Sequence, residues 1–425
     1  MKKVLIFLLF SITSNMAFSQ ISIEYCQKKA KENYPTFRNT GILEKTSKFS
    51  INNANKNYLP QFNLSAKASY QSDVTSLDIE FPFAIDLDLP TMPKDQYQAV
   101  LELSQLIWDG GYTSNKKEEI RAELETKKAS LEVELYTLRD RIANIYFGII
   151  SIKEQKSQAK LMEKELERNY NQILAFMEGG LANESDLDLI RVEQLHINQR
   201  IVEIDLMEKS YIRVLSLLIG ENLKYDSEFS EPNLSTSNLK DEIMRPELMA
   251  FESQINLLDL KNKMLNAQSY PYLGFFAQGG YGKPALNMFK EDPDLFALVG
   301  LRLSWNISSF YTRKDNQRII ETNKELINSN KSAFILNTKL QQETQKSEIQ
   351  RLEKLVFSDK EIIELRERIK NSSEYKLENG TISTSDYIKD VNAFDLANQN
   401  MIVHKTQLLM SIYKYNNIIN SDDEK

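Results

Sequence analysis

The sequence predicts a mostly helical chain that carries four β-strands and is built as an internal duplication. Its 425 residues include only 13 Gly and 10 Pro, and so few breaks for the length favour few, long elements. Two segments of about 66 residues contain almost no helix breaker. Ahead of each segment lie two stretches in which apolar and polar residues alternate, which is the pattern of β-strands.

Residues 1–19 read as a secretory signal peptide. Lys2 and Lys3 precede an apolar run, and Ala17-x-Ser19 forms a small-residue cleavage site. No later stretch reaches the ~18 consecutive apolar residues of a membrane helix. We therefore expect the mature chain either to be soluble or to enter a membrane as strands.

Charge and cysteine content exclude several function classes. The formal charge is −7, and removal of two signal-peptide lysines makes it −9, whereas nucleic-acid binding needs a basic surface. Cys26 is the single cysteine, so the sequence offers neither an intrachain disulfide nor a zinc cluster. We expect a buried or inert thiol, and no cofactor or metal.

The strands of the first half are predicted at about 61–71 and 97–107. In the first, Phe62, Leu64, Ala66, Ala68 and Tyr70 alternate with polar residues that include Lys67. In the second, Ala99, Leu101 and Leu103 share one face. The period of two and the length of about ten residues are typical of strands in an outer-membrane barrel.

The strands of the second half are predicted at about 272–282 and 295–306. One face carries Leu273, Phe275, Ala277 and Tyr281 from the first strand and Ala297, Val299, Leu301, Leu303 and Trp305 from the second. Arg302 lies on the opposite face. A half-exposed sheet of a soluble protein has the same alternation, but four such strands in a secreted chain with very long helices favour a membrane.

Long helices are predicted at about 112–177 and 312–377, each followed by a shorter one, at 186–219 and 386–419. In the first, Leu131, Leu135, Leu138, Ile142, Ile145, Ile149 and Ile152 follow the alternating spacing of a coiled-coil seam. In the second, Ile319, Leu326, Ala333 and Leu340 recur every seven residues. At 1.5 Å per residue, each long helix spans roughly 100 Å.

The turn between each long and short helix repeats, as "GGLANESDL" at 179–187 and "NGTISTSDY" at 379–387. Gly180 and Gly380 can adopt the left-handed conformation that ends a helix. The side chains that cap the following helices are expected to be Asn183 and Ser383. The carboxylates three residues later, Asp186 and Asp386, favour the helix N-terminus, and capping alone would explain both.

The same order of elements in both halves defines the expected organisation. The boundaries are 1–19 for the signal peptide, 20–223 for the first repeat, 224–240 for a linker, 241–420 for the second repeat and 421–425 for a tail. Because the smallest membrane barrels have eight strands and lipid tolerates no open edge, four strands must be completed by other copies.

The chain resembles outer-membrane efflux proteins of the TolC type (the outer membrane factor family). The resemblance rests on "YLPQFNLSA" at the first strand, "LIWDGG" at the junction with the long helix, the paired turns and "LLIGENL" at 217–223. It implies a homotrimer whose α-barrel tunnel is topped by a shared 12-stranded β-barrel in the cell outer membrane and its lipid. It also implies passive export with a periplasmic adaptor protein and an inner-membrane pump of RND or ABC type.

The resemblance also implies roles for particular residues. Adaptor docking would fall on the periplasmic tips, at Gly180, Leu181, Gly380 and Thr381. Lys67 and Arg302 would face the water-filled lumen of the barrel.

A gate would close the periplasmic end, and its candidates are Asp186, Asp386, Lys389 and Asp390. Family members often place a second acidic residue where this chain has Lys389, and a basic residue where it has Ile382. This departure predicts a gate of mixed charge. The alternative, in which Asp386 only caps its helix and Lys389 points outward, stays open.

Two other function classes fit less well. An enzyme is not expected, because the only histidines, His196 and His404, lie on helices with no nearby cysteine and no ligand-like partner. A periplasmic coiled-coil adaptor or scaffold is the remaining alternative. Such a protein would have one helical hairpin and no alternating ten-residue strands.

Overall fold

The structure is a computed structural model, and it describes residues 20–75, 91–234, 241–288, 290 and 292–420. The predicted signal peptide and tail lie outside these residues. The chain divides into two compact units, Met1–Arg38 with Leu131–Pro246 and Ser332–Lys425, and Asn39–Ser130 with Glu247–Lys331, called unit 1 and unit 2. The long helices α3 (Tyr112–Glu178) and α6 (Ser309–Glu378) each contribute residues to both units.

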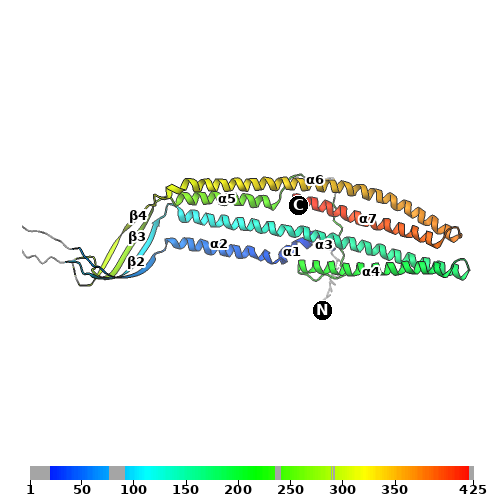
Figure 1. Cartoon of the computed structure of the whole chain (residues 1–425), viewed down its shortest axis with the longest axis horizontal. Helices are drawn as coiled ribbons and strands as arrows, with labels where there is room; N and C mark the ends of the chain where they lie inside the picture. Colours follow the sequence, from blue (N-terminus) through cyan, green and yellow to red (C-terminus); the bar gives the residue numbers. More distant parts are fainter. Residues whose placement is uncertain (1–19, 76–90, 235–240, 289, 291, 421–425) are drawn as a thin grey trace, which may run out of the picture. The chain divides into compact units, whose positions relative to one another are not determined.

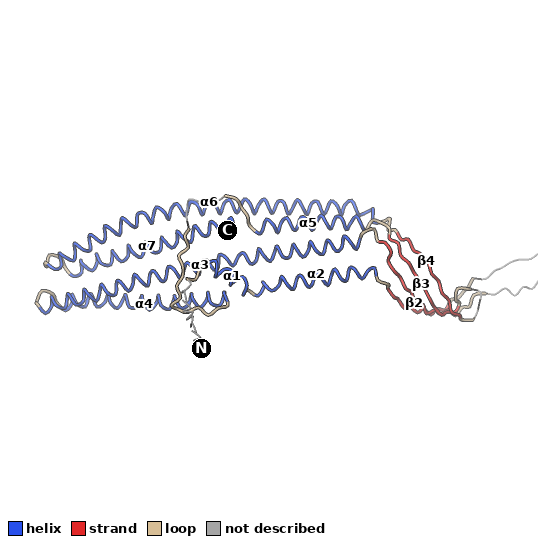
Figure 2. The backbone as a smooth tube through the Cα atoms, turned by 180° about the vertical axis from the view of Figure 1, so that it is seen from behind, coloured by secondary structure: helices blue, strands red, loops and turns tan. Residues whose placement is uncertain are grey.

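Unit 2 contains one sheet of four antiparallel strands (Figure 2). Its strands are β1 (Gln61–Tyr70), β2 (Asp95–Trp108), β3 (Tyr272–Lys283) and β4 (Asp294–Ser304). They pair in the order β1-β2-β3-β4, so β1 and β4 are the two edges. The predicted strands and their pairing within each half are therefore present.

Four helical segments lie side by side in unit 2 (Figure 1). They are α2 (Asn39–Asn55), the start of α3, α5 (Pro246–Ala267) and the start of α6. Ion pairs and hydrogen bonds join neighbours: Lys128 with Glu44 at 2.8 Å, Thr126 Oγ1 with the Ser253 carbonyl at 3.2 Å, and Lys324 with Asp259 at 2.6 Å. The two outer helices of this row are therefore α2 and α6.

Unit 1 is built around two helical hairpins, α3 with α4 (Glu184–Ile219) and α6 with α7 (Thr384–Ile419). A further helix, α1 (Ile23–Asn33), packs on α4. The single glycine inside α3, Gly148, permits close packing of α3 against α4, because a Cβ there would lie 2.4 Å from the Tyr211 ring. Cys26 is fully buried in the same core, as expected, and burial raises the pKa of its thiol to about 12.

Tyr146 anchors the start of the described chain and the linker to α3. Its ring makes an edge contact with Phe229, with centroids 5.6 Å apart. Its hydroxyl lies 2.7 Å from the Ile21 carbonyl oxygen and 2.6 Å from that of Ser230. Ile21 and Phe229 in turn form an isolated parallel bridge. The described part of the linker, residues 224–234, thus packs against the unit 1 core.

The predicted fold class of the single chain is confirmed: its described residues are mostly helical, with four strands and two long helical hairpins. Helices α1, α2 and α5 were not predicted from the sequence, nor were the 3-10 turns Pro35–Arg38 and Lys56–Tyr58. The short helices α4 and α7 also begin two residues before the predicted starts, at Glu184 and Thr384.

Candidate functional site

One face of the sheet is apolar and largely uncovered. Strand register places Leu64 opposite Leu101, and Val299 opposite Ala277. The same face carries Phe62, Leu103, Leu273, Phe275, Tyr281, Leu295, Leu301 and Leu303. Leu301 is 68% exposed and Leu295 77%. A contiguous apolar surface of this kind marks contact with lipid or protein rather than water.

The opposite face carries the polar residues. Lys67 pairs in register with Gln98, and Arg302 lies two residues from Gly300 on the same face. Gln278 donates a hydrogen bond of 2.9 Å to Glu102, and the Arg302 guanidinium lies 3.6 Å from that carboxylate. Lys67 and Arg302 therefore share a face, and Leu101, Val299 and Leu301 lie on the other.

Aromatic residues flank the apolar face at both ends of the strands. A bulge between Leu106 and Trp108 shifts the register, so that Trp108 joins the apolar face opposite Leu273. Trp305 follows β4, and its indole N–H donates to the Ser269 carbonyl at 3.0 Å. Tyr70, Tyr97 and Tyr281 lie toward the other strand ends. Alternation alone did not predict the Trp108 position, because the bulge breaks the period of two.

The first tip closes α3 with a left-handed glycine. Gly180 has a φ of 70°, and Leu181 N–H donates to the Phe176 carbonyl at 2.7 Å. Asn183 and Asp186 form a reciprocal capping box, with both hydrogen bonds at 3.1 Å. Leu181 is 79% exposed, and a Cβ added at Gly180 would meet no atom within 4 Å. The predicted cap is confirmed.

The second tip has the same design. Gly380 has a φ of 67° and open space around it, and Thr381 N–H donates to the Lys376 carbonyl at 2.8 Å. Ser383 caps α7 by accepting from the Asp386 N–H at 3.1 Å. The four tip residues predicted for docking are thus exposed and have backbone geometry fixed by their own turns.

The gate candidates of the second tip all have partners within the chain. Asp386 accepts from the Ser383 hydroxyl at 2.7 Å and from Lys389 at 3.3 Å. The Ser383 hydroxyl and then the Lys389 ammonium hold the pKa of Asp386 below its usual value. Asp390 accepts a short hydrogen bond from Ser373 on α6. In a single chain these carboxylates therefore stabilise the tip itself.

Polar contacts also tie the two hairpins of unit 1 together. The buried Tyr387 donates to Asn169 of α3 at 3.1 Å. Arg200 of α4 lies 2.9 Å from Asp395 of α7. Lys370 and Glu165 join α6 to α3 at 3.1 Å. Sequence reasoning missed these contacts because their partners are far apart along the chain.

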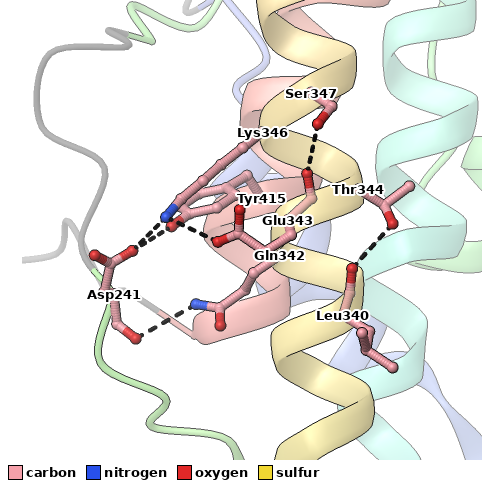
Figure 3. A network of polar contacts seen from close by, with 8 residues as sticks. All are labelled: Asp241, Leu340, Gln342, Glu343, Thr344, Lys346, Ser347 and Tyr415. Atoms are coloured by element: carbon pink, nitrogen blue, oxygen red, sulfur yellow. Dashed lines mark hydrogen bonds and ion pairs between the residues drawn. The ribbon is translucent and has the colours of Figure 1, made fainter.

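Asp241, the first residue after the linker, contacts both α6 and α7 (Figure 3). Its carboxylate accepts from Lys346 at 2.8 Å and from the Tyr415 hydroxyl at 3.0 Å. Its main-chain carbonyl accepts from Gln342 at 3.4 Å. Lys346, and then Tyr415, lower the pKa of Asp241. Asp241 is thus held by both helices of the second hairpin.

Within the described ranges, no group of three or more His, Cys, Asp or Glu could hold a metal ion. His404 lies 2.7 Å from Asp359, a pairing that the sequence did not predict.

No helix among the described residues has an apolar run long enough to cross a lipid bilayer.

Comparison with known proteins identifies a family and several solved structures to which this chain is similar. Residues 27–210 match the family described as outer membrane efflux protein. The predicted resemblance to outer-membrane efflux proteins is confirmed. The outer-membrane location and the transport role expected from the sequence agree with this family. A search of curated proteins gave no match.

Solved structures of outer-membrane proteins and channels share the fold over nearly the whole chain. VceC from Vibrio cholerae is 11% identical with a TM-score of 0.65, covering 93% of this chain and 95% of that one. CmeC from Campylobacter jejuni is 15% identical with a TM-score of 0.60, covering 95% and 86%. The open state of MtrE from Neisseria gonorrhoeae is 13% identical with a TM-score of 0.64, covering 93% and 88%. CmeC and MtrE are outer-membrane channels.

Proposed function

We propose that the chain forms the outer-membrane exit duct of a tripartite efflux or type I secretion system. In this function three copies share one 12-stranded barrel and one helical tunnel. A periplasmic adaptor and an inner-membrane pump of RND or ABC type supply selection and energy. The observation that carries the proposal is the sheet, which has an exposed apolar face, a polar face and two open edges.

The two faces fit a barrel wall. Lipid covers the apolar face with Leu101, Val299 and Leu301, and the polar face with Lys67 and Arg302 lines a water-filled lumen. Aromatic residues at both ends of the strands match the girdles that flank the apolar band of membrane barrels.

The open edges fit a closed ring of copies. Four antiparallel strands leave β1 and β4 running in opposite directions, so β4 of one copy can pair with β1 of the next in the antiparallel manner. Lipid cannot satisfy the backbone groups of an open edge. If further copies close the ring, the backbone N–H and C=O groups of both edge strands find hydrogen-bond partners. The number of three copies follows the expectation from the family.

Free apolar seams on the outer helices of unit 2 support the same assembly. On α2, Ile42 and Phe49 are spaced seven residues apart and exposed, as are Ile319 and Leu326 on α6. Such spacing is typical of a helix that packs on a partner helix. We propose that α6 of one copy packs against α2 of its neighbour.

The tips provide the surface for the adaptor. Gly180, Leu181, Gly380 and Thr381 are exposed and leave room for an approaching helix. The proposed gate lies beside them, at Asp186, Asp386, Lys389 and Asp390. Because Lys389 neutralises part of the Asp386 charge, three copies brought together would form a constriction of mixed charge.

Export in cells that lack the native chain tests this function. Gly180→Asp with Gly380→Asp places a charged side chain at φ values that favour glycine, so the tips distort while the trimer stays in the membrane. We expect loss of export with normal levels of outer-membrane trimer. A matched control, Gly41→Ala, lies on α2 with no atom within 4 Å and should export normally. Full export by the double variant would contradict tip docking.

A further inference from the structure

Two phenylalanine rings on the polar face of the sheet lie over glycines of the adjacent strand. Phe276 on β3 is the register partner of Gly300 on β4, and Phe296 is the partner of Gly280. A Cβ at Gly300 would lie 2.8 Å from Cε1 and 2.9 Å from Cζ of Phe276. A Cβ at Gly280 would lie 2.5 Å from Cζ of Phe296. Each ring therefore occupies the space that a side chain on the opposite strand would fill.

This packing keeps the rings close to the sheet. Side chains of strands normally stand roughly perpendicular to the sheet, so a ring that reaches sideways over a glycine projects less far. The Arg302 guanidinium also contacts one of the rings, with its central carbon 4.8 Å from the Phe276 centroid. Glu102 lies 3.6 Å from the same guanidinium. The position of Phe276 is thus defined by Gly300 and by the Arg302–Glu102 pair.

We propose that the two glycine–phenylalanine pairs set the free cross-section of the duct at the level of the strands, and with it the size of the molecules that can enter the duct from the strand side. The inference rests on the proposed function, in which the polar face lines the lumen. Three copies would bring six such rings to the inner wall. Flat rings leave the lumen open, whereas raised rings would narrow it.

Gly300→Ala is the variant that raises a ring with the least other change. Gly300 has no positive φ, and the atoms nearest to an added Cβ belong to the Phe276 ring. The backbone can therefore keep its path, while the ring must move away from the sheet. Gly280→Ala is less suitable, because its Cβ would also lie 2.7 Å from the Ala99 carbonyl oxygen.

Gly279→Ala is the matched control. It is a glycine of the same hairpin, on the apolar face, and the nearest atom to an added Cβ is 4.0 Å away. It adds the same methyl group without touching either ring. The double variant Phe276→Ala with Gly300→Ala removes the ring that the single variant displaces.

The test is single-channel conductance of the purified full-length protein in planar bilayers, with neutral polyethylene glycols of graded size added on the strand side. We expect Gly300→Ala to lower the conductance and the size of the largest polymer that enters. Gly279→Ala should match the wild type, and Phe276→Ala, alone or with Gly300→Ala, should exceed it.

Two results would overturn this inference without affecting the proposed duct. The first is a wild-type conductance and polymer size limit for both Gly300→Ala and Phe276→Ala. The second is a double variant whose polymer size limit is as small as that of Gly300→Ala. If Gly300→Ala does not assemble, Phe276→Ala decides, because an unchanged polymer size limit contradicts the proposal. A wild-type protein that forms no channel would instead overturn the duct itself.

Discussion

The two long helices carry similar heptad seams, yet one seam is buried and the other is exposed. On α3, Ile142 is 1% exposed, and the rest of its seam from Leu131 to Ile152 is buried or partly buried. On α6, Leu326 and Leu340 are each 59% exposed. Both seams have the spacing that packs one helix on another.

The difference shows that a heptad pattern indicates packing against another helix but does not indicate whether that helix belongs to the same chain or to another copy. The α3 seam packs against α1 and α4 of its own chain. The α6 seam starts on the outer helix of the unit 2 row and has no comparable cover. A long exposed apolar seam is costly in water, so a second copy is the partner that we propose.

The largest expected effect is on folding, at the buried seam. Ile142→Ala should lower the free energy of unfolding by about 2–5 kcal/mol, because it leaves a cavity in the core. Leu340→Ala, the matched change at the exposed seam, should alter the stability of the separated chain by less than about 0.5 kcal/mol. Denaturant unfolding of both variants checks this contrast, and equal losses would show that both seams are core.

A second prediction concerns assembly. Leu326→Asp with Leu340→Asp places two charges in the proposed interface between copies and should abolish the trimer on native electrophoresis. Helical content of the separated chain should stay normal, because both positions are exposed. Gln341→Glu, which adds a charge beside the seam, is the control and should assemble. A normal trimer from the double variant would contradict a packed α6 seam.

The sheet contains the same kind of contrast between its two faces. Val299→Arg places a charge on the face proposed to meet lipid, which costs about 2–4 kcal/mol at the middle of the membrane. It should reduce the amount of assembled trimer in the outer membrane, whereas Arg302→Gln on the polar face should not. Quantification of trimer in membrane fractions separates the two, and equal effects would mean that the faces are wrongly assigned.

The smallest expected effect is a change in ion selectivity at the second tip, where hydrogen bonds within the chain already account for the positions of Asp386 and Lys389. Lys389→Asp removes the cation that lies 3.3 Å from Asp386 and adds a carboxylate. If this position lines a constriction, cation preference in bilayers should increase while conductance persists. Unchanged selectivity would leave Asp386 as a cap and Lys389 as a surface residue.

Local patterns predicted much of this fold because their causes are local. Alternation predicted the strands, and the Gly180 and Asn183 positions predicted the tip, since φ and capping depend on neighbouring residues. Helix α2 was missed because its mixed sequence, "NTGILEKTSKFSINNAN", has a weak apolar pattern, and contacts such as Lys128 with Glu44 hold it.

Contacts between distant residues could not be predicted in this way. Asp241 and Lys346 are 105 residues apart, and nothing in either local sequence indicates the other. The pairing of Phe276 with Gly300 likewise depends on the register of β3 with β4. A single glycine in a strand indicates that another group packs closely against the backbone there, but the sequence does not identify that group.

The mass of the native assembly extracted from the outer membrane tests the central claim most directly. The account predicts a particle of three chains in the outer-membrane fraction, and its dissociation by Leu326→Asp with Leu340→Asp. A wild-type monomer in the soluble periplasmic fraction would contradict it, because the open strand edges and the exposed α6 seam would then have no second copy to cover them.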